Sequence, residues 1–333
     1  MGPIITHAAG IVVKYTEMTI KVISKGFEVD GGVSRYDSDV VFTSERTCRD
    51  YDWLVVYDDL PEAEELSCPA SRTILATCEP VSIKSYSRGF VRQFGHLLTN
   101  RPQTAENHPR WHLGRGYYKW FCGRTLAEAR AMAWPEKTKG ITVVCSSKSM
   151  RHTRHADRLR LIRHLSENLP GLDWFGHGVR SFGRKFEVTD PYRYQVVVEN
   201  HIAPHHWTEK LTDAFLSGCL PFYAGAPDLA DDFPRESFVP IPIDDPATAL
   251  EVIRAAVSAG EYEKRREALE EARRLVLERY NFYAQVCEVI RAAGDGDADR
   301  SIRVIRPRRA VRLRDPLSAL EDAFGHLRRA LFA

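Results

Sequence analysis

The sequence predicts an α/β protein of two consecutive domains of similar size that face a common cleft. Three observations lead to this prediction. The chain has 333 residues, which is enough for two hydrophobic cores. In each half, short apolar runs alternate with segments of helical periodicity, a pattern typical of mainly parallel sheets with crossover helices. The polar segment 135–140, PEKTKG, has no hydrophobic period, so we predict one domain over 1–135 and another over 136–294.

The composition is that of an ordinary soluble protein and excludes several classes. With a formal net charge of +2, the chain as a whole is not expected to bind nucleic acid. Its seven cysteines are scattered without C-x-x-C spacing, which favours reduced thiols in the cytoplasm over a disulfide scaffold or a zinc site. No apolar run approaches the roughly 20 residues of a membrane span, and the N-terminus is too polar for a signal peptide.

The first half is organised around buried strands. Apolar runs predict these strands at 11–13, 18–23, 53–57, 72–77 and 96–99. Helices are expected at 86–94 and 125–134, the second with a capping box of Thr125 and Glu128. Glu79 follows the strand 72–77 and directly precedes Pro80. A carboxylate there could act as a general base facing the cleft, although most such acids are solvated loop residues.

The second half repeats this rhythm. Strands are expected at 141–145, 172–175, 196–198, 220–224 and 238–243, with helices at 155–168, from 246 onward and at 265–280. Between the strands 196–198 and 220–224, Thr208 is expected to cap a helix that Gly218 ends. In an open parallel sheet, ligands bind where a strand meets the following helix, so this junction is the candidate site.

Glu209 and Lys210 occupy the first turn of that helix. A helix N-terminus offers free N–H groups and a partial positive charge, and Lys210 adds a full charge suited to a diphosphate. Glu209 can accept two hydrogen bonds from a ribose diol. The alternative is that the helix dipole alone favours an acidic residue there. Glu199 and Asn200 end the preceding strand, and they either face the cleft or cap the loop.

Two other polar groups invite a functional interpretation. Arg154 stands at the start of the helix 155–168, near Arg151 and His152, where a doubly wound domain binds phosphate. The alternative is a solvated basic helix. The loop histidines lack the fixed spacing and third ligand of a metal site, so we expect no metal there. These histidines are His201, His205 and His206.

The composition changes at the end of the chain, in residues 295–333. An acidic linker at 294–299 precedes seven arginines interleaved with apolar residues. An apolar stripe at helical spacing then follows, formed by Leu317, Leu320, Phe324, Leu327 and Leu331. Such a basic amphipathic tail suits peripheral contact with an anionic membrane. The alternative is a terminal helix that packs its stripe on the body of the protein and leaves the arginines in water.

The candidate junction resembles the hallmark segment of glycosyltransferase family 10, the α-1,3/1,4-fucosyltransferases of bacterial type. The matching motifs are Glu199-Asn200, Thr208-Glu209-Lys210, Gly218-Cys219-Leu220-Pro221 and Gly225-Ala226-Pro227. The segments CSSKSMRHTRHADRLRLIRHL, DWFGHG and ILATCEPVSIKSY, with FVRQFGHLLT, extend the resemblance over roughly 50–245. The chain departs from the family at Ser147, Val198 and His206, where Asn, Phe and Tyr are usual.

The resemblance implies a GT-B architecture, in which two Rossmann-like domains face a central cleft, here followed by the basic amphipathic tail. GDP-fucose would lie on the second domain and a glycan acceptor on the first, and one inverting displacement would need neither metal nor cofactor. By position, the donor would be bound by Arg154 and Lys210 at the diphosphate, Glu209 at the ribose, and Asn200 and His206 elsewhere. Glu79 would take the proton of the acceptor hydroxyl.

The acceptor implied by the resemblance is a GlcNAc-type sugar of a surface glycan or lipopolysaccharide, joined through an α-1,3 linkage at the cytoplasmic face of the inner membrane. Ser217, eight residues after Glu209, stands where retaining GT-B enzymes commonly carry a second glutamate, which favours inversion. Alternatives are another GDP-sugar as donor, or a metal-dependent GT-A enzyme using Asp37-Ser38-Asp39 or Asp50-Tyr51-Asp52. A non-enzymatic module that binds membrane or polyanion through the tail is a further alternative.

Overall fold

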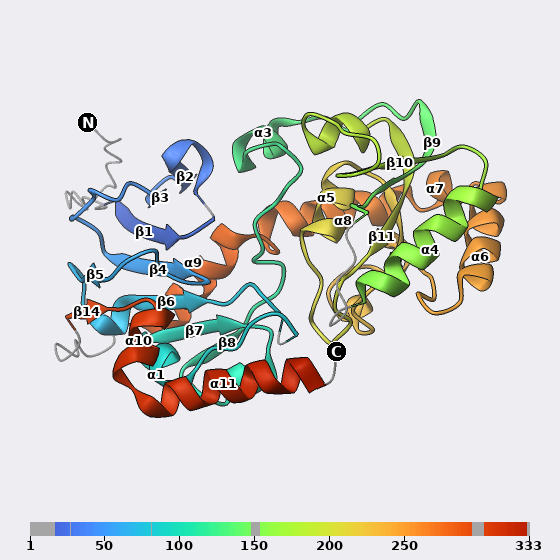
Figure 1. Ribbon diagram of the computed structural model, residues 1–333. Helices are drawn as coiled ribbons and strands as arrows, with labels where there is room; N and C mark the ends of the chain where they lie inside the picture. The colour runs from blue at the N-terminus through green and yellow to red at the C-terminus, as the bar shows by residue number, and fades with distance from the viewer. Residues whose placement is uncertain (1–16, 27, 81, 148–153, 295–302, 332–333) are drawn as a thin grey trace, which may run out of the picture.

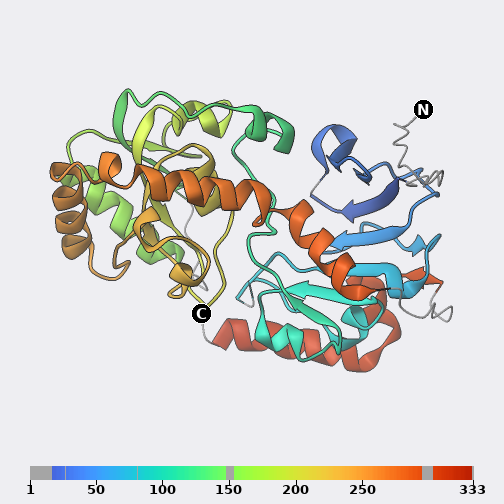
Figure 2. The same ribbon diagram turned by 180° about the vertical axis from the view of Figure 1, so that it is seen from behind.

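The computed structural model describes the whole chain except residues 1–16, 27, 81, 148–153, 295–302 and 332–333. The predicted strand at 11–13 and nearly all of the acidic linker lie outside the described residues. Two open sheets stand side by side, and two consecutive helices near the end of the chain run from the second to the first (Figures 1 and 2). Within the described part, no helix combines the length and apolar character needed to cross a bilayer.

The first sheet has seven strands in the order β2-β3-β1-β4-β6-β7-β8, parallel except for β2. Its strands are β1 (Met18–Ser24), β2 (Val33–Asp37), β3 (Val40–Thr43), β4 (Trp53–Tyr57), β6 (Thr73–Ala76), β7 (His96–Thr99) and β8 (Trp111–Leu113). The predicted strands at 18–23, 53–57, 72–77 and 96–99 are therefore confirmed. The sheet is buried on both faces, which explains why β4 reads as a continuous apolar run.

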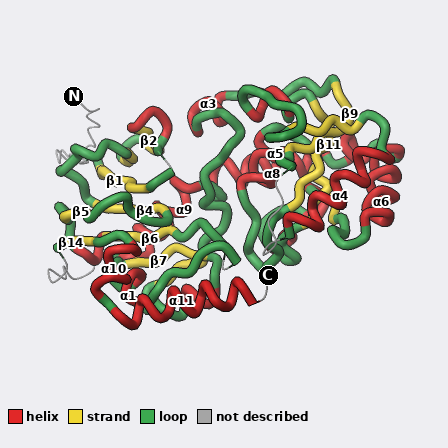
Figure 3. Tube along the Cα trace, in the orientation of Figure 1, coloured by secondary structure: helices red, strands yellow, loops and turns green. Residues whose placement is uncertain are grey.

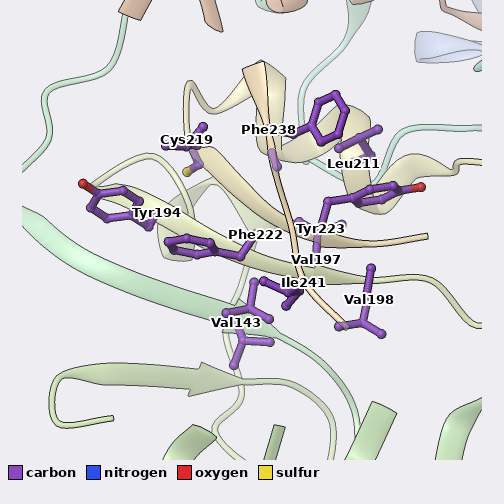
Figure 4. Packing of buried hydrophobic residues seen from close by; sticks show 14 of the residues in the cluster. Val143, Tyr194, Val197, Val198, Leu211, Cys219, Phe222, Tyr223, Phe238 and Ile241 are labelled. Atoms are coloured by element: carbon purple, nitrogen blue, oxygen red, sulfur yellow. The ribbon is translucent and has the colours of Figure 1, made fainter. Parts of the chain in front are cut away.

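The second sheet has five parallel strands in the order β10-β9-β11-β12-β13. Its strands are β9 (Lys139–Val144), β10 (Leu172–Phe175), β11 (Tyr192–Val198), β12 (Leu220–Ala224) and β13 (Val239–Pro240). Side chains of neighbouring strands pack closely in its core. The rings of Tyr194 on β11 and Phe222 on β12 stack with centroids 5.5 Å apart (Figure 4).

Helices cover these sheets. They are α1 (Arg88–Val91), α2 (Pro102–Ala105), α3 (Leu126–Ala131), α4 (His155–Asn168), α5 (Glu209–Leu216), α6 (Pro246–Ser258), α7 (Glu261–Lys264), α8 (Arg266–Glu278), α9 (Phe282–Ala293), α10 (Arg308–Arg314) and α11 (Pro316–Leu331). The predicted helices at 155–168 and 265–280 are confirmed, as is the capping box of Thr125 and Glu128 on α3. The helix expected at 86–94 is shorter, because only 88–91 are helical. Figure 3 shows the segment after α3 running to β9 of the second domain.

The first domain is completed by the end of the chain. Alternate residues of β4 point to opposite faces of the sheet. Val55 packs in one cluster with Phe282 and Val286 of α9, whereas Leu54 packs in another with Phe90 of α1. Helix α9 thus covers the first sheet, although residues 136–294 were predicted to form the second domain as one unit. The apolar residues of α9 recur at helical spacing, which predicts a helix with one apolar face. This spacing does not show which of the two sheets that face covers.

The basic tail also packs on the first domain. Ile305 lies in the same cluster as Leu54 and is fully buried. It belongs to β14 (Val304–Ile305), which pairs antiparallel with β5 (Glu64–Glu65). Helix α10 follows, with its backbone Arg308 N–H donating to Asp59 Oδ1 at 3.1 Å. The predicted third unit, 295–333, is therefore part of the packing of the first domain.

We predict that Ile305→Ala lowers the free energy of unfolding by about 3 kcal/mol, because it leaves a cavity in a closed apolar cluster. Leu313→Ala, on the exposed side of α10, is the matched control and should change it by less than about 0.5 kcal/mol. Urea unfolding followed by circular dichroism measures both. Equal effects of the two substitutions would mean that the tail is not part of the folded core.

Candidate functional site

The second sheet has a topological switch point between β9 and β11. After β9 the chain passes to β10 on one side, and it then returns to β11 on the other side. Connections leaving in opposite directions open a crevice at the carboxyl ends of these two strands. A cavity of about 720 Å³ lies there, within the usual size range of ligand sites. Its polar and charged lining residues are Ser146, His155, Arg158, Arg184, Lys185, Asn200, Glu209 and Lys210.

Helix α5 begins at this cavity as predicted. Thr208 is its N-cap, and Glu209 and Lys210 form the first turn. The fully buried Glu199 carboxylate connects β11 to this turn, since its Oε1 accepts hydrogen bonds from Thr208 N at 2.9 Å and from Thr208 Oγ1 at 3.0 Å. Of the two interpretations of Glu199, the loop-capping one is therefore right. The carboxylate has no exposed surface through which to take a proton from a substrate in the cleft.

Ion pairs stabilise the charged forms of Glu209 and Lys210 in the first turn of α5. Lys210 Nζ lies 3.0 Å from Glu209 Oε1 and 3.3 Å from Glu199 Oε2. Burial alone would lower the pKa of Lys210, but these two carboxylates outweigh it and raise that pKa above its ordinary value. Burial would likewise raise the pKa of Glu209, but Lys210 and Lys185 lower it overall. Both groups are therefore charged at neutral pH.

Arg158 is a site residue that the sequence analysis missed. It lies on the buried face of α4, together with Leu161, Ile162 and Leu165, and it lines the cavity. Its Nη1 donates a hydrogen bond to Asn200 Oδ1, while its buried Nε has no hydrogen-bond partner in the part of the chain that the structure describes. A signal was present in the sequence. An arginine at an apolar-face position of a helix needs a buried anionic or polar partner.

Lys185 is the second missed residue. It precedes β11 and lines the cavity, with its Nζ 2.8 Å from Oδ2 of the fully buried Asp213. Asp213 lies one helical turn beyond Glu209 on α5, and its Oδ1 also accepts a hydrogen bond from the backbone of Phe121 at 3.3 Å. Phe121 belongs to the segment between the two domains and also lines the cavity. No local pattern links residues 185 and 213, so only the fold reveals this pair.

Glu79 follows the carboxyl end of β6 in the first domain. Partial burial raises the pKa of its carboxyl, and the nearby Asp58 carboxylate raises it further. The charges of Glu209 and Lys210 in the second domain also act on it, in opposite directions. Glu79 therefore lies near enough to the first turn of α5 for these two charges to affect its pKa. Asp58 adopts a left-handed backbone, φ 72°, and is paired with Lys84 at 2.5 Å.

Comparison with solved structures identifies the fold. An α-1,3-fucosyltransferase solved with GDP superimposes with a TM-score of 0.51 at 15% identity, covering 89% of this chain and 94% of that one. An α-1,3-fucosyltransferase solved with GDP-fucose gives 0.50 at 13% identity, covering 89% and 95%. This chain has the GT-B fold. No protein-family model and no curated protein sequence matches it.

The GT-B fold confirms the predicted architecture and rules out the GT-A alternative. The Asp37-Ser38-Asp39 segment forms the turn between β2 and β3, and the Asp52 carboxylate accepts a backbone hydrogen bond from Thr19 at 2.8 Å. Among the described residues, no group of three or more His, Cys, Asp or Glu side chains is arranged to hold a metal.

Arg154, predicted to bind the donor diphosphate, is not among the residues that line this cavity. It precedes the first turn of α4, and its guanidinium pairs with Asp244 and, at 2.9 Å, with Asp157. Its backbone N–H donates a hydrogen bond at 3.1 Å to the backbone O of Asn200, a residue that lines the cavity. The cation that lines the cavity from α4 is Arg158, one helical turn further along. Arg151 and His152 lie outside the described residues.

His206, also predicted to bind the donor, is not among the residues that line this cavity either. It is buried between the domains, with its Nδ1 3.3 Å from both Asn100 Nδ2 and Tyr118 OH of the first domain. Burial lowers its pKa to about 3, so it is a neutral contact between domains. The backbone N–H of His205 donates a hydrogen bond to Asp228 Oδ1 at 2.9 Å. The sequence position of His206 in the loop did not reveal that the first domain covers it.

We predict that Asp213→Asn lowers the free energy of unfolding by about 3 kcal/mol, because it leaves Lys185 largely buried without its carboxylate. Glu263→Gln removes the exposed pair with Arg193 and should cost less than about 1 kcal/mol. Denaturant titration of both variants measures the difference. If Asp213→Asn proved as stable as the control, Asp213 would not hold Lys185 at the cavity.

Proposed function

We propose that this chain is an inverting glycosyltransferase that moves a sugar, fucose, from GDP-fucose to a hydroxyl of a glycan acceptor. The observation that carries the proposal is the switch-point cavity, where Arg158, Lys185 and Lys210 meet at the N-terminus of α5. Three cations and free helix N–H groups suit the two negative phosphates of a nucleoside diphosphate. Glu209, ionised beside them, suits the diol of a ribose.

The structural neighbours support a guanine nucleotide as the donor. The α-1,3-fucosyltransferases with the same fold were solved with GDP and with GDP-fucose. The resemblance of residues 194–228 to fucosyltransferase motifs points to the same donor. As acceptor we propose a GlcNAc-type sugar of a surface glycan or lipopolysaccharide, with α-1,3 transfer, and this finer assignment rests on that sequence resemblance alone.

The proposed reaction is a single displacement across the cleft. The Glu79 carboxylate takes the proton of the acceptor hydroxyl, whose oxygen attacks the anomeric carbon of the donor sugar from the face opposite GDP. The bond between that carbon and the diphosphate oxygen breaks, and its electron pair leaves with GDP. Arg158, Lys185 and Lys210 stabilise the negative charge that develops on the leaving diphosphate. Glu79 keeps the acceptor proton until the products depart.

Donor binding is tested by GDP affinity. We predict that Arg158→Ala and Lys185→Met each weaken GDP binding at least about tenfold, because each removes a charge-assisted contact to the diphosphate. Arg154→Ala is the matched control, since its guanidinium is held by Asp157 and Asp244 beside the cavity, and it should leave GDP affinity within about twofold. Isothermal titration calorimetry measures all three variants.

A reversed order in that experiment, with Arg154→Ala weakening GDP binding and Arg158→Ala leaving it intact, would favour the sequence-based assignment of Arg154 to the diphosphate. Absence of binding by wild-type protein to GDP, with binding to another nucleoside diphosphate instead, would overturn the donor class. Thermal unfolding of each variant without nucleotide separates a binding defect from a folding defect.

The role of Glu79 is tested through the pH profile. Since the base must be ionised, activity rises with pH through the Glu79 pKa, and the acid limb should lie above the ordinary glutamate value of about 4.3. Asp58→Asn removes a negative charge that raises this pKa, so the acid limb should move to lower pH. Glu79→Gln should keep GDP affinity and lose at least about a hundredfold in kcat. Near-normal transfer by Glu79→Gln would assign the base elsewhere.

A further inference from the structure

Helix α11 packs on the first domain through polar side chains. Ser318 and Asp322, four residues apart on one face, are both buried. Asp322 Oδ1 accepts a hydrogen bond from Ser85 Oγ at 2.9 Å, and its Oδ2 lies 3.4 Å from both Arg308 and Arg312 of α10. The Glu321 carboxylate accepts a hydrogen bond from the backbone of Arg88, at the start of α1, at 2.7 Å.

The close approach of α11 to α1 confirms that this contact is specific. A Cβ on Gly89 of α1 would lie 2.4 Å from Ser318 Oγ and 2.6 Å from Asp315 Oδ2, so a larger residue there would displace these two side chains. The orientation of α11 about its own axis is therefore determined by its polar side, which faces the protein.

The apolar stripe of the tail consequently faces away from the protein. The exposed fractions are 80% for Leu313, 71% for Leu317, 55% for Leu320 and 68% for Phe324. The alternative of a terminal helix that buries its stripe on the body of the protein is therefore wrong for the described part of α11: the helix docks, but its stripe is exposed. Leu327 and Leu331 belong to the same predicted stripe, and their side chains lie outside the described part.

Amphipathic helices of globular proteins turn their apolar face to the core, so an inverted helix needs another apolar environment. Large exposed apolar patches on folded proteins mark surfaces that bind a partner or a membrane. The charge around this stripe distinguishes a protein partner from a membrane. Residues 303–333 hold eight arginines against three acidic residues, and Arg309 and Arg314 beside the stripe are exposed. Two copies meeting through this face would bring like charges together, whereas an anionic lipid surface attracts it.

We propose that the outward face of α10 and α11, formed by Leu313, Leu317, Leu320 and Phe324, inserts into the interface of an anionic bilayer. The arginines beside this face contact lipid phosphates while the apolar side chains enter the acyl boundary. The polar underside of α11 stays on the first domain, so that domain is held rigidly against the membrane.

The position of this face also bears on the acceptor. Helix α11 lies along the first domain and runs towards the second (Figures 1 and 2). The first domain is the one that carries Glu79, so membrane contact would present the acceptor side of the cleft to glycans attached to lipid. This last step rests on the proposed function, whereas the membrane contact itself does not.

The test is co-sedimentation of the full chain with vesicles, which needs no catalytic activity. Wild-type protein should sediment with vesicles of phosphatidylcholine and phosphatidylglycerol at low salt and much less with phosphatidylcholine alone. The double variant Leu320→Ser, Phe324→Ser should bind at least about tenfold more weakly, since two apolar side chains no longer enter the lipid. Val257→Ser, an exposed apolar residue on α6 of the second domain, is the matched control and should bind as wild type.

Three results would overturn the proposal. Wild-type protein that does not sediment with anionic vesicles contradicts it directly, as does a double variant that binds as well as wild type. The third is a wild-type dimer in analytical ultracentrifugation that the double variant converts to monomer without losing vesicle binding, since the face would then be an interface between copies. Thermal unfolding of the double variant shows whether it is folded. Its GDP affinity should equal that of wild type, so a failure here is distinguishable from a failure of the proposed donor site.

Discussion

The candidate site depends on how one buried carboxylate is satisfied. Glu199 ends β11 with no exposure to water, and a buried carboxylate is strongly destabilising unless hydrogen bonds and an opposite charge compensate it. Thr208 supplies the hydrogen bonds and Lys210 the charge, so the end of the strand and the first turn of α5 are held together. This constraint leaves the helix N-terminus and Glu209 facing the cavity. Lys210 thus both neutralises the buried Glu199 carboxylate and lines the site.

The remaining groups reach the cavity from distant parts of the chain. Arg158 comes from α4, and Lys185 comes from the segment before β11, where Asp213 of α5 holds it. The first domain closes against the same region through Asn100 and the neutral His206, and α9 and the tail complete its two faces. The proposed donor side, acceptor side and membrane face are therefore parts of one packed structure.

Local patterns in the sequence predicted local structure well. Apolar runs predicted β4, β6 and β7, and Thr208 with Glu209 predicted the start of α5. These features could be predicted because helix caps and strand patterns depend on residues that are close in the sequence. Such patterns show which residues share a face, but not what covers that face. Arg154 caps α4 and Arg158 lies one helical turn further along, and only packing decides that Arg158 lines the cavity. The Lys185–Asp213 pair and the inverted stripe of α11 likewise arise from contacts between segments far apart in the chain.

A crystal structure of the complex with GDP tests the central claim most directly, namely that the switch-point cavity binds a nucleoside diphosphate. The account predicts the diphosphate at the N-terminus of α5, with Arg158 and Lys185 within hydrogen-bond distance of its oxygens and the ribose hydroxyls on Glu209. A diphosphate bound instead at Arg154 and Asp244, or in the separate pocket beside Gly225 and Pro227, would contradict it.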